Sequence, residues 1–236
     1  MSRRAAGLAA CFILGMTLTV ADGDATSALA PYFRARDEGR TDAVTGDAYA
    51  ESRRPGGSPV AYGDVSVLLL PYSSSFEGEL DRILAGLRES SLAYVEAAER
   101  LRVAREAYEH VLLFAGGGEL IRGEVTDAGG RFRFEGVPAG SWLMLAWRDI
   151  PHGASARRIP GREQGAFVGN VERMGYVAVE YWRQRVEVRP GEASTIRLHD
   201  RNIWATLVRE EHRLPDRRTT PGDVGGGAKR RQGTTR

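Results

Sequence analysis

Cysteine is nearly absent from this chain of 236 residues: Cys11 is the single one, and it lies within an apolar stretch near the N-terminus. If that stretch is removed, the remaining protein can form no disulfide and has no thiol nucleophile. Its stability must therefore come from a hydrophobic core.

Histidine is also scarce, and the four residues stand far apart, at His110, His152, His199 and His212. None of them begins the His-x-x-Glu pair that holds zinc in metallocarboxypeptidases. The Gly-x-Ser-x-Gly spacing of a serine hydrolase does not occur, and the glycine triplets lack the strand, lysine and helix of a phosphate-binding loop. We therefore expect no catalytic residue, no metal site and no cofactor.

Long apolar runs are limited to one segment, Ala5–Val20, which follows Arg3 and Arg4 and precedes the small residue Ala21. This pattern predicts a signal peptide over 1–21. The run is shorter than the roughly 20 residues that a membrane-spanning helix needs. We therefore expect no membrane span and a periplasmic or secreted protein.

An alternative for the N-terminus remains open. Leu8-Ala9-Ala10-Cys11 resembles a bacterial lipobox, in which the cysteine is lipidated and becomes the new N-terminus. The protein would then be a lipoprotein anchored through Cys11.

Two segments have few large apolar residues. The first, 22–47, is rich in Asp, Arg, Gly, Ala and Thr, and predicts a flexible linker. The second, 213–236, has seven basic residues against Asp216 and Asp223, and predicts a disordered basic tail. Because such tails are usually solvated, we expect no nucleic-acid partner.

A helical insert is predicted over 77–114. Apolar and small residues follow a three-four spacing there, with Glu and Arg between them. One continuous helix would be about 55 Å long, whereas the next three glycines span only about 10 Å, so the strands on either side could not meet. We predict a helical hairpin that breaks near Gly86–Ser91, where Ser90 or Ser91 can cap the second helix. A single helix that crosses the sandwich stays an alternative.

Strands are predicted on both sides of the insert, where residues alternate between apolar and polar. Their ranges are 48–53, 64–70, 120–126, 131–134, 141–147, 176–188, 195–198 and 203–208. The segment from Val125 to Trp142 predicts a β-hairpin and then a tight corner, because Gly129 and Gly130 can adopt a positive φ and Asp127 can bind the turn. We expect Phe132, Phe134 and Trp142 in the core.

The strand over 141–147 is apolar on both faces. Trp142, Met144 and Ala146 share one face, whereas Leu143, Leu145 and Trp147 share the other. We expect the helical insert to cover the second face, which gives a three-layer arrangement. A dimer interface is the competing explanation.

A long polar connection, Asp149–Asn170, is one candidate interaction surface, through Arg157, Arg158, Arg162 and Phe167, because recognition is often carried by long loops. Exposed aromatic rings are the other candidate, and we select Trp182. The full aromatic set is Trp147, Tyr176, Tyr181, Trp182 and Trp204. Such rings could stack on sugars, although aromatic residues are more often core.

A family resemblance rests on four short segments: Pro55-Gly56-Gly57-Ser58-Pro59-Val60, Thr126 to Phe134, Val137-Pro138-Ala139-Gly140 and Arg189-Pro190-Gly191-Glu192. With the strands that follow them, they resemble the carboxypeptidase regulatory-like domain, a transthyretin-like antiparallel β-sandwich. The helical insert departs from that family, and Trp142 stands where the family commonly has tyrosine. The resemblance implies a mainly β domain over 48–212 that is attached to other proteins and is not itself a catalyst.

The function expected from the sequence is therefore that of an exported, non-catalytic interaction or structural module with a protein partner in the cell envelope. A carbohydrate-binding module is the first alternative. A metal-dependent hydrolase is the second, and it would require several of the dispersed histidines to converge.

Overall fold

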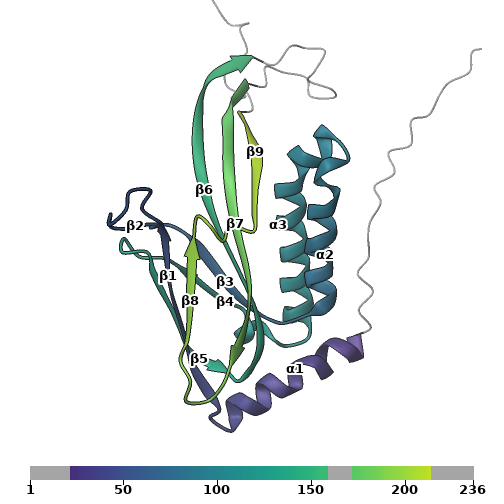
Figure 1. The fold of residues 1–236 in the computed structure, drawn as a ribbon. Helices are drawn as coiled ribbons and strands as arrows, with labels where there is room; N and C mark the ends of the chain where they lie inside the picture. The colour runs from purple at the N-terminus through teal and green to yellow at the C-terminus, as the bar shows by residue number, and fades with distance from the viewer. Residues whose placement is uncertain (1–21, 159–171, 214–236) are drawn as a thin grey trace, which may run out of the picture.

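The computed structural model describes residues 22–158 and 172–213. Figure 1 shows two sheets on one side, a pair of helices along one of them, and a further helix across their lower end. The elements are α1 (Asp22–Asp37), β1 (Thr41–Ala50), β2 (Val60–Ala61), β3 (Ser66–Pro71), α2 (Ser74–Ala85), η1 (Gly86–Arg88), α3 (Ser91–Phe114), η2 (Gly118–Leu120), β4 (Arg122–Val125), β5 (Arg131–Pro138), β6 (Gly140–Arg158), β7 (Glu172–Val188), β8 (Ser194–His199) and β9 (Ala205–Arg213).

The described strands form two sheets. In the first sheet, β1 pairs with β2, β5 and β8, and the second sheet has the order β4-β3-β6-β7-β9. Pairing is antiparallel except between β1 and β8, which run parallel with Val44 opposite Ser194. The chain is therefore mainly β, and the predicted sandwich with an inserted helical hairpin is confirmed.

The helical insert is a hairpin. The side-chain oxygens of Ser73 and Ser90 accept hydrogen bonds from Phe76 N and Ala93 N at the starts of α2 and α3. Between the helices, η1 begins at Gly86, so the chain turns where the sequence predicted a break. Figure 1 shows α2 and α3 side by side along the sheet that contains β7 and β9.

Both faces of β6 are covered, as predicted. Trp142, Leu143, Met144, Leu145 and Ala146 are all buried. Leu145 and Trp147 face the helical hairpin, because they line a pocket together with residues of α3. Since neighbouring residues of a strand point to opposite faces, Trp142 and Met144 point into the sandwich. The β6 strand is thus the centre of three layers.

The linker predicted over 22–47 is wrong, because helix α1 and most of β1 occupy this segment. Leu29, Tyr32 and Ala35 are buried, and the Tyr32 ring meets the edge of the Trp142 ring at a centroid distance of 5.1 Å. The Tyr32 hydroxyl donates to Ser141 O and accepts from Tyr72 N. These few contacts fix α1 on the end of the sandwich, although its composition resembles that of a linker.

The first strand also begins earlier than predicted, at Thr41. Its inward positions are Val44, Gly46 and Ala48, which are too small to give a strong apolar alternation. A Cβ on Gly46 would lie 2.3 Å from Phe132 Cζ. The large ring of β5 therefore fills the space that larger side chains of β1 would otherwise occupy.

The predicted hairpin between 120–126 and 131–134 is wrong, although its turn is present. Asp127 Oδ1 accepts hydrogen bonds from the backbone of Gly129 and Arg131, at 2.8 and 2.9 Å, and Gly130 has a φ of 75°. However, β4 pairs with β3, whereas β5 pairs with β1 in the other sheet. The turn therefore connects the two sheets.

Hydrogen bonds to both sheets explain this crossing. Thr126 Oγ1 donates to Tyr62 O and accepts from Val65 N, next to β3. On the other side of the turn, Gly130 O accepts from Ala48 N of β1 at 2.7 Å. Phe132 and Phe134 then point into the core, where they are buried as predicted.

The described part of the polar connection predicted from Asp149 to Asn170, residues 149–158, is strand, and the rest lies outside the described residues. The β6 strand continues to Arg158 and pairs with β7 as far as Glu172. Pro151, Gly153 and the prolines and glycines after them led to the loop prediction. However, β3 ends its pairing at Trp147, so among the described strands this part of β6 pairs with β7 alone. A proline is tolerated on a strand edge whose backbone amide lacks a partner.

Two predicted terminal segments lie outside the described residues, except for Arg213, which ends β9. These are the signal peptide over 1–21 with Cys11, and the disordered basic tail over 213–236. The boundaries of a domain over 48–212 stay a prediction.

Candidate functional site

A pocket of about 150 Å³ lies between α3 and the sheet formed by β6, β7 and β9. Its apolar wall includes Leu80 of α2, Leu101 of α3 and Leu145 of β6. Three segments that are distant in the sequence therefore meet here, and the helical insert supplies one complete side.

Three aromatic side chains line this pocket: Trp147, Tyr181 and Trp204. Trp147 and Tyr181 are directly opposite each other on β6 and β7, and Trp204 N donates to Tyr181 O at 2.8 Å just before β9 begins. All three rings are half-buried. They belong to the aromatic set that the sequence suggested, and the structure brings them to one place.

Arginines cover part of these rings. The Arg105 guanidinium lies 4.5 Å from the centre of the Trp147 ring, and that of Arg183 lies 4.4 Å from the ring of Trp204. Each contact is a cation–π interaction, which fixes the arginine and occupies one face of the indole. One face of each indole is therefore covered by an arginine.

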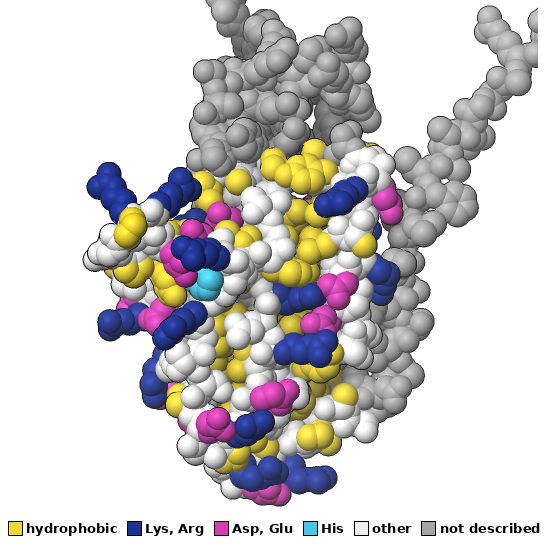
Figure 2. Space-filling model, viewed as in Figure 1, with side chains coloured by type: hydrophobic (Ala, Val, Ile, Leu, Met, Phe, Trp, Pro, Cys, Tyr) yellow, Lys and Arg dark blue, Asp and Glu magenta, His cyan; other side chains and the backbone are white. Residues whose placement is uncertain are grey.

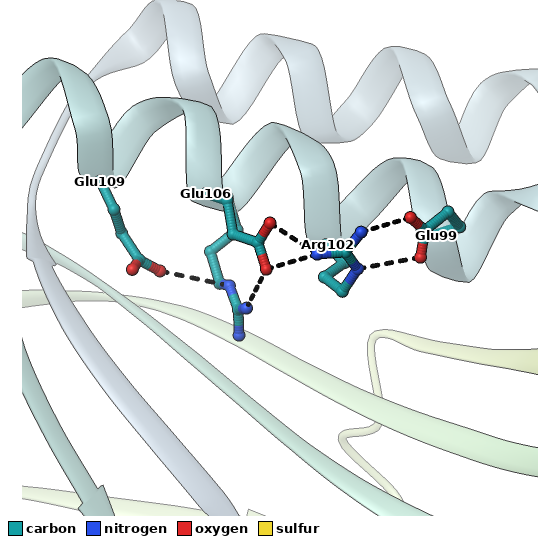
Figure 3. A network of polar contacts seen from close by, with 5 residues as sticks. Glu99, Arg102, Glu106 and Glu109 are labelled. Atoms are coloured by element: carbon teal, nitrogen blue, oxygen red, sulfur yellow. Dashed lines mark hydrogen bonds and ion pairs between the residues drawn. The ribbon is translucent and has the colours of Figure 1, made fainter.

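A charged ladder runs along α3 beside the pocket (Figure 3). Arg102 donates to Glu99 and Glu106, and Arg105 contacts Glu106 and Glu109. The hydrogen bonds from Arg102 lower the pKa of Glu99 and of Glu106, and they raise the pKa of Arg102. Glu99, Arg102 and Glu106 are therefore charged at neutral pH, and ion pairs hold their side chains in place.

A third arginine, Arg209 of β9, lines the pocket from the sheet side. Its Nη2 donates to Asp149 Oδ2 at 2.7 Å. Nearby, burial raises the pKa of Tyr181 to about 12, so its phenol is neutral at physiological pH. Within the described residues, no other side chain forms a hydrogen bond with the Tyr181 hydroxyl, so this group can donate to a ligand.

A second network attaches the hairpin to the sheet. The carboxylate of Glu77 on α2 is buried, and it accepts from Arg185 Nε at 3.0 and 3.1 Å and from the Tyr72 hydroxyl at 3.0 Å. Its pKa is lowered, chiefly by the hydrogen bonds from Arg185. Arg183 reaches from β7 to Asp81 at 2.7 Å. These contacts hold α2, which supplies Leu80 to the pocket, in position on the sheet.

The candidate surface predicted from the sequence does not coincide with the pocket. Trp182 is 1% exposed, and its indole donates to His199 O at 3.0 Å, so it is core and the prediction is wrong for this residue. Arg157 and Arg158 belong to the end of β6, opposite Arg173 and Glu172. Arg162 and Phe167 lie outside the described residues.

Reasoning from the sequence missed the arginines in the pocket. Arg102 and Arg105 look like ordinary solvated charges on an amphipathic helix, and Arg209 looks like a polar residue of a final strand. One signal was available. Glu99, Arg102 and Glu106 have the spacing of helical ion pairs, which predicts a fixed charged stripe on one side of α3.

The dispersed histidines are not brought together where they are described. His110 is exposed on α3, and His199 stacks on Tyr49 in the other sheet. Over 22–158 and 172–213, no three His, Cys, Asp or Glu residues gather at metal-ligand distance.

The visible surface mixes both signs of charge. Figure 2 shows Lys or Arg and Asp or Glu side chains interspersed on this face, with hydrophobic side chains between them. In the part of the chain that the structure describes, no helix has the length and apolar character to cross a membrane.

No family model matches this chain, and no curated protein matches it. Among solved structures, it is similar to a Pseudomonas aeruginosa protein for which carbohydrate binding has been proposed. The identity is 15%, over 68% of this chain and 88% of the other, with a TM-score of 0.38. The carboxypeptidase regulatory-like family therefore stays a resemblance.

The chain is also similar to the pilus backbone protein RrgB of Streptococcus pneumoniae. The identity is 14%, over 66% of this chain and 40% of the other, with a TM-score of 0.25. For the full-length major pilin RrgB the identity is 13%, over 67% of this chain and 30% of the other, with a TM-score of 0.26. This chain therefore spans less than half of either RrgB structure. The β-sandwich is established by the strand pairing above, and these distant alignments add no function.

Proposed function

We propose that this protein is an exported, non-catalytic binding module that holds a small ligand between its helical hairpin and its five-stranded sheet. One observation carries the proposal: the pocket gathers Trp147, Tyr181 and Trp204 together with arginines held by ion pairs. Apolar walls with a few oriented polar groups are typical of ligand sites.

Under this proposal, the helical insert forms one side of the ligand site. It covers the apolar face of β6, and the remaining gap beside α3 is the pocket. Because the Glu77 network and the ladder on α3 fix both walls, the site is formed in advance and a ligand need not order it.

Binding can be tested by calorimetry on the purified protein with a panel of single-ring sugars and aromatic compounds. We expect at least one of them to bind, and Trp204→Leu to weaken it at least tenfold without unfolding the protein. Tyr49→Leu, a half-buried aromatic in the other sheet, is the matched control and should bind normally. The same affinity in both variants would place the ligand elsewhere and overturn the proposal.

The non-catalytic part has its own test. Highly purified protein should show no peptidase, esterase or glycosidase turnover. Turnover that co-purifies with the protein and disappears in a pocket variant would refute this part of the proposal.

Export is proposed from the N-terminal pattern. The protein should be found in the periplasmic or extracellular fraction and should start after Ala21 by N-terminal sequencing. Incorporation of labelled palmitate that is lost in Cys11→Ser would instead show the lipoprotein form.

A protein partner in the cell envelope is the second candidate function, and exposed apolar side chains at the end of α3 favour it. Leu113 is 54% exposed and Phe114 is 90% exposed. A partner captured by the tagged protein should be lost with Phe114→Ser but kept with Val60→Ser, a 65% exposed residue of the other sheet. Loss with neither variant would exclude this surface.

A further inference from the structure

The volume of the pocket is enough for one ring. A buried cavity of about 150 Å³ is large enough for benzene, and this pocket has about the same volume. An arginine covers one face of the Trp147 indole and one face of the Trp204 indole, so a ligand can stack only on the opposite faces. A single six-membered ring fits beside the aromatic and leucine side chains.

The lining charges are strongly unequal. Among the residues that the structure describes, Arg102, Arg105 and Arg209 line the pocket, whereas Glu99 is the one acidic side chain in its lining. The other counter-ions, Glu106, Glu109 and Asp149, bind these arginines from outside the lining. The side chains that line the pocket are therefore more often positive than negative, and each of the three arginines is ion-paired to at least one carboxylate.

Two of these arginines keep hydrogen-bond donors for a ligand. A guanidinium has five N–H donors. Within the described residues, Arg209 donates one side-chain hydrogen bond, to Asp149, and Arg105 donates one, to Glu106. Arg105 Nε is also buried without a hydrogen bond, because Glu109 Oε1 lies 3.2 Å away but outside hydrogen-bond geometry.

From these observations we infer that the pocket takes a small ligand in which one six-membered ring carries a carboxylate. The ring lies against Trp147, Tyr181 and Leu145, and the carboxylate accepts hydrogen bonds from Arg105 and Arg209. Planar guanidinium groups suit a carboxylate because two parallel hydrogen bonds can form. A uronic acid and a single-ring aromatic acid share this chemistry. This inference rests on the proposed function and specifies its ligand.

The test is calorimetric titration of the full chain with glucuronate, galacturonate and benzoate, each compared with its neutral partner, which is glucose, galactose or benzyl alcohol. We expect at least one acid to bind at least tenfold more tightly than its neutral partner. The pair that shows the difference distinguishes a sugar acid from an aromatic acid. The preference should weaken as salt concentration rises.

Variants locate the charge that makes this preference. Arg209→Gln should weaken acid binding about tenfold and neutral-ring binding by a clearly smaller factor, whereas Arg209→Lys should restore part of the loss of acid binding. Arg197→Gln is the control, since Arg197 is exposed on β8 in the other sheet. Circular dichroism establishes that each variant is folded, and Arg105→Gln replaces any Arg209 variant that is not.

The outcomes separate the two proposals. Equal binding of acids and neutral rings overturns the inference and leaves the proposed function standing. An acid preference that survives Arg209→Gln, or Arg105→Gln where the Arg209 variant does not fold, has the same consequence. Failure of every ring compound to bind overturns both.

Discussion

Replacing Trp142 by phenylalanine should remove a large part of the stability of this fold. Trp142 is fully buried at the start of β6, its indole donates to Pro138 O at 2.9 Å, and Tyr32 packs on it from α1. The substitution therefore affects the β5–β6 corner, the core of the sandwich and the attachment of α1 together.

The expected loss has two parts. Removing the indole N–H leaves the Pro138 carbonyl without its partner, which costs about 1–3 kcal/mol. The smaller ring leaves a void, and roughly 40 Å³ of void costs about 1 kcal/mol at about 24 cal/mol per Å³. The sum is about 2–4 kcal/mol.

Urea denaturation followed by far-UV circular dichroism measures this loss. With a slope of about 2 kcal/mol per molar urea, the midpoint should fall by about 1–2 M. Trp147→Phe is the matched control from the same strand. Trp147 is half-buried, and among the described residues its indole nitrogen makes no hydrogen bond, so the loss should be about 1 kcal/mol or less. A larger loss in Trp147→Phe than in Trp142→Phe would refute the reasoning.

Three further predictions concern other parts of the fold. Glu77→Gln should lower the unfolding free energy by about 1 kcal/mol at pH 7, a small value because solvent screens the largely exposed Arg185. Since the folded pKa of Glu77 is below its usual value, this contribution should vanish as the pH falls through that pKa. A difference from wild type that persists unchanged at pH 2 would contradict the prediction. Gly130→Ala should lower the unfolding free energy by at least about 2 kcal/mol, because the residue has a φ of 75° and a Cβ would lie 2.3 Å from Ala48 O. Gly129→Ala is the control: its Cβ would meet only the Asp127 side chain, at 3.2 Å, so the loss in the same urea experiment should be clearly smaller. Burial raises the pKa of Tyr181 to about 12, so the protein should lose stability as the pH rises from 10 to 12, and Tyr181→Phe should reduce that loss in alkaline denaturation curves.

The sequence predicted the elements whose signal is local and strong. The three-four spacing of the insert and the serine before its second helix gave the helical hairpin, because amphipathic periodicity and capping depend on neighbouring residues alone. The apolar residues on both faces of 141–147 likewise predicted the buried strand and the helical cover. Phe132, Phe134 and Trp142 were placed correctly in the core for the same reason.

Elements whose stability comes from distant contacts were missed. Helix α1 buries few residues, and Tyr32 is held by Trp142 and Ser141, more than 100 positions away in the sequence. The inward residues of β1 are small because the Phe132 ring of β5 fills the space next to them. The polar end of β6 is a strand because β7 provides its backbone partners.

The sequence by itself thus determined which segments are helix or strand wherever periodicity was strong, and it selected Trp147, Tyr181 and Trp204 as members of an aromatic set. The tertiary structure decided which strands pair, so that the turn at Asp127–Gly130 joins two sheets and not two neighbours in one sheet. It also decided that these three rings and the arginines of α3 and β9 share a pocket while Trp182 is core. The physical reason is that periodicity fixes the face on which a side chain lies, whereas its neighbours are fixed by contacts between segments far apart in the chain.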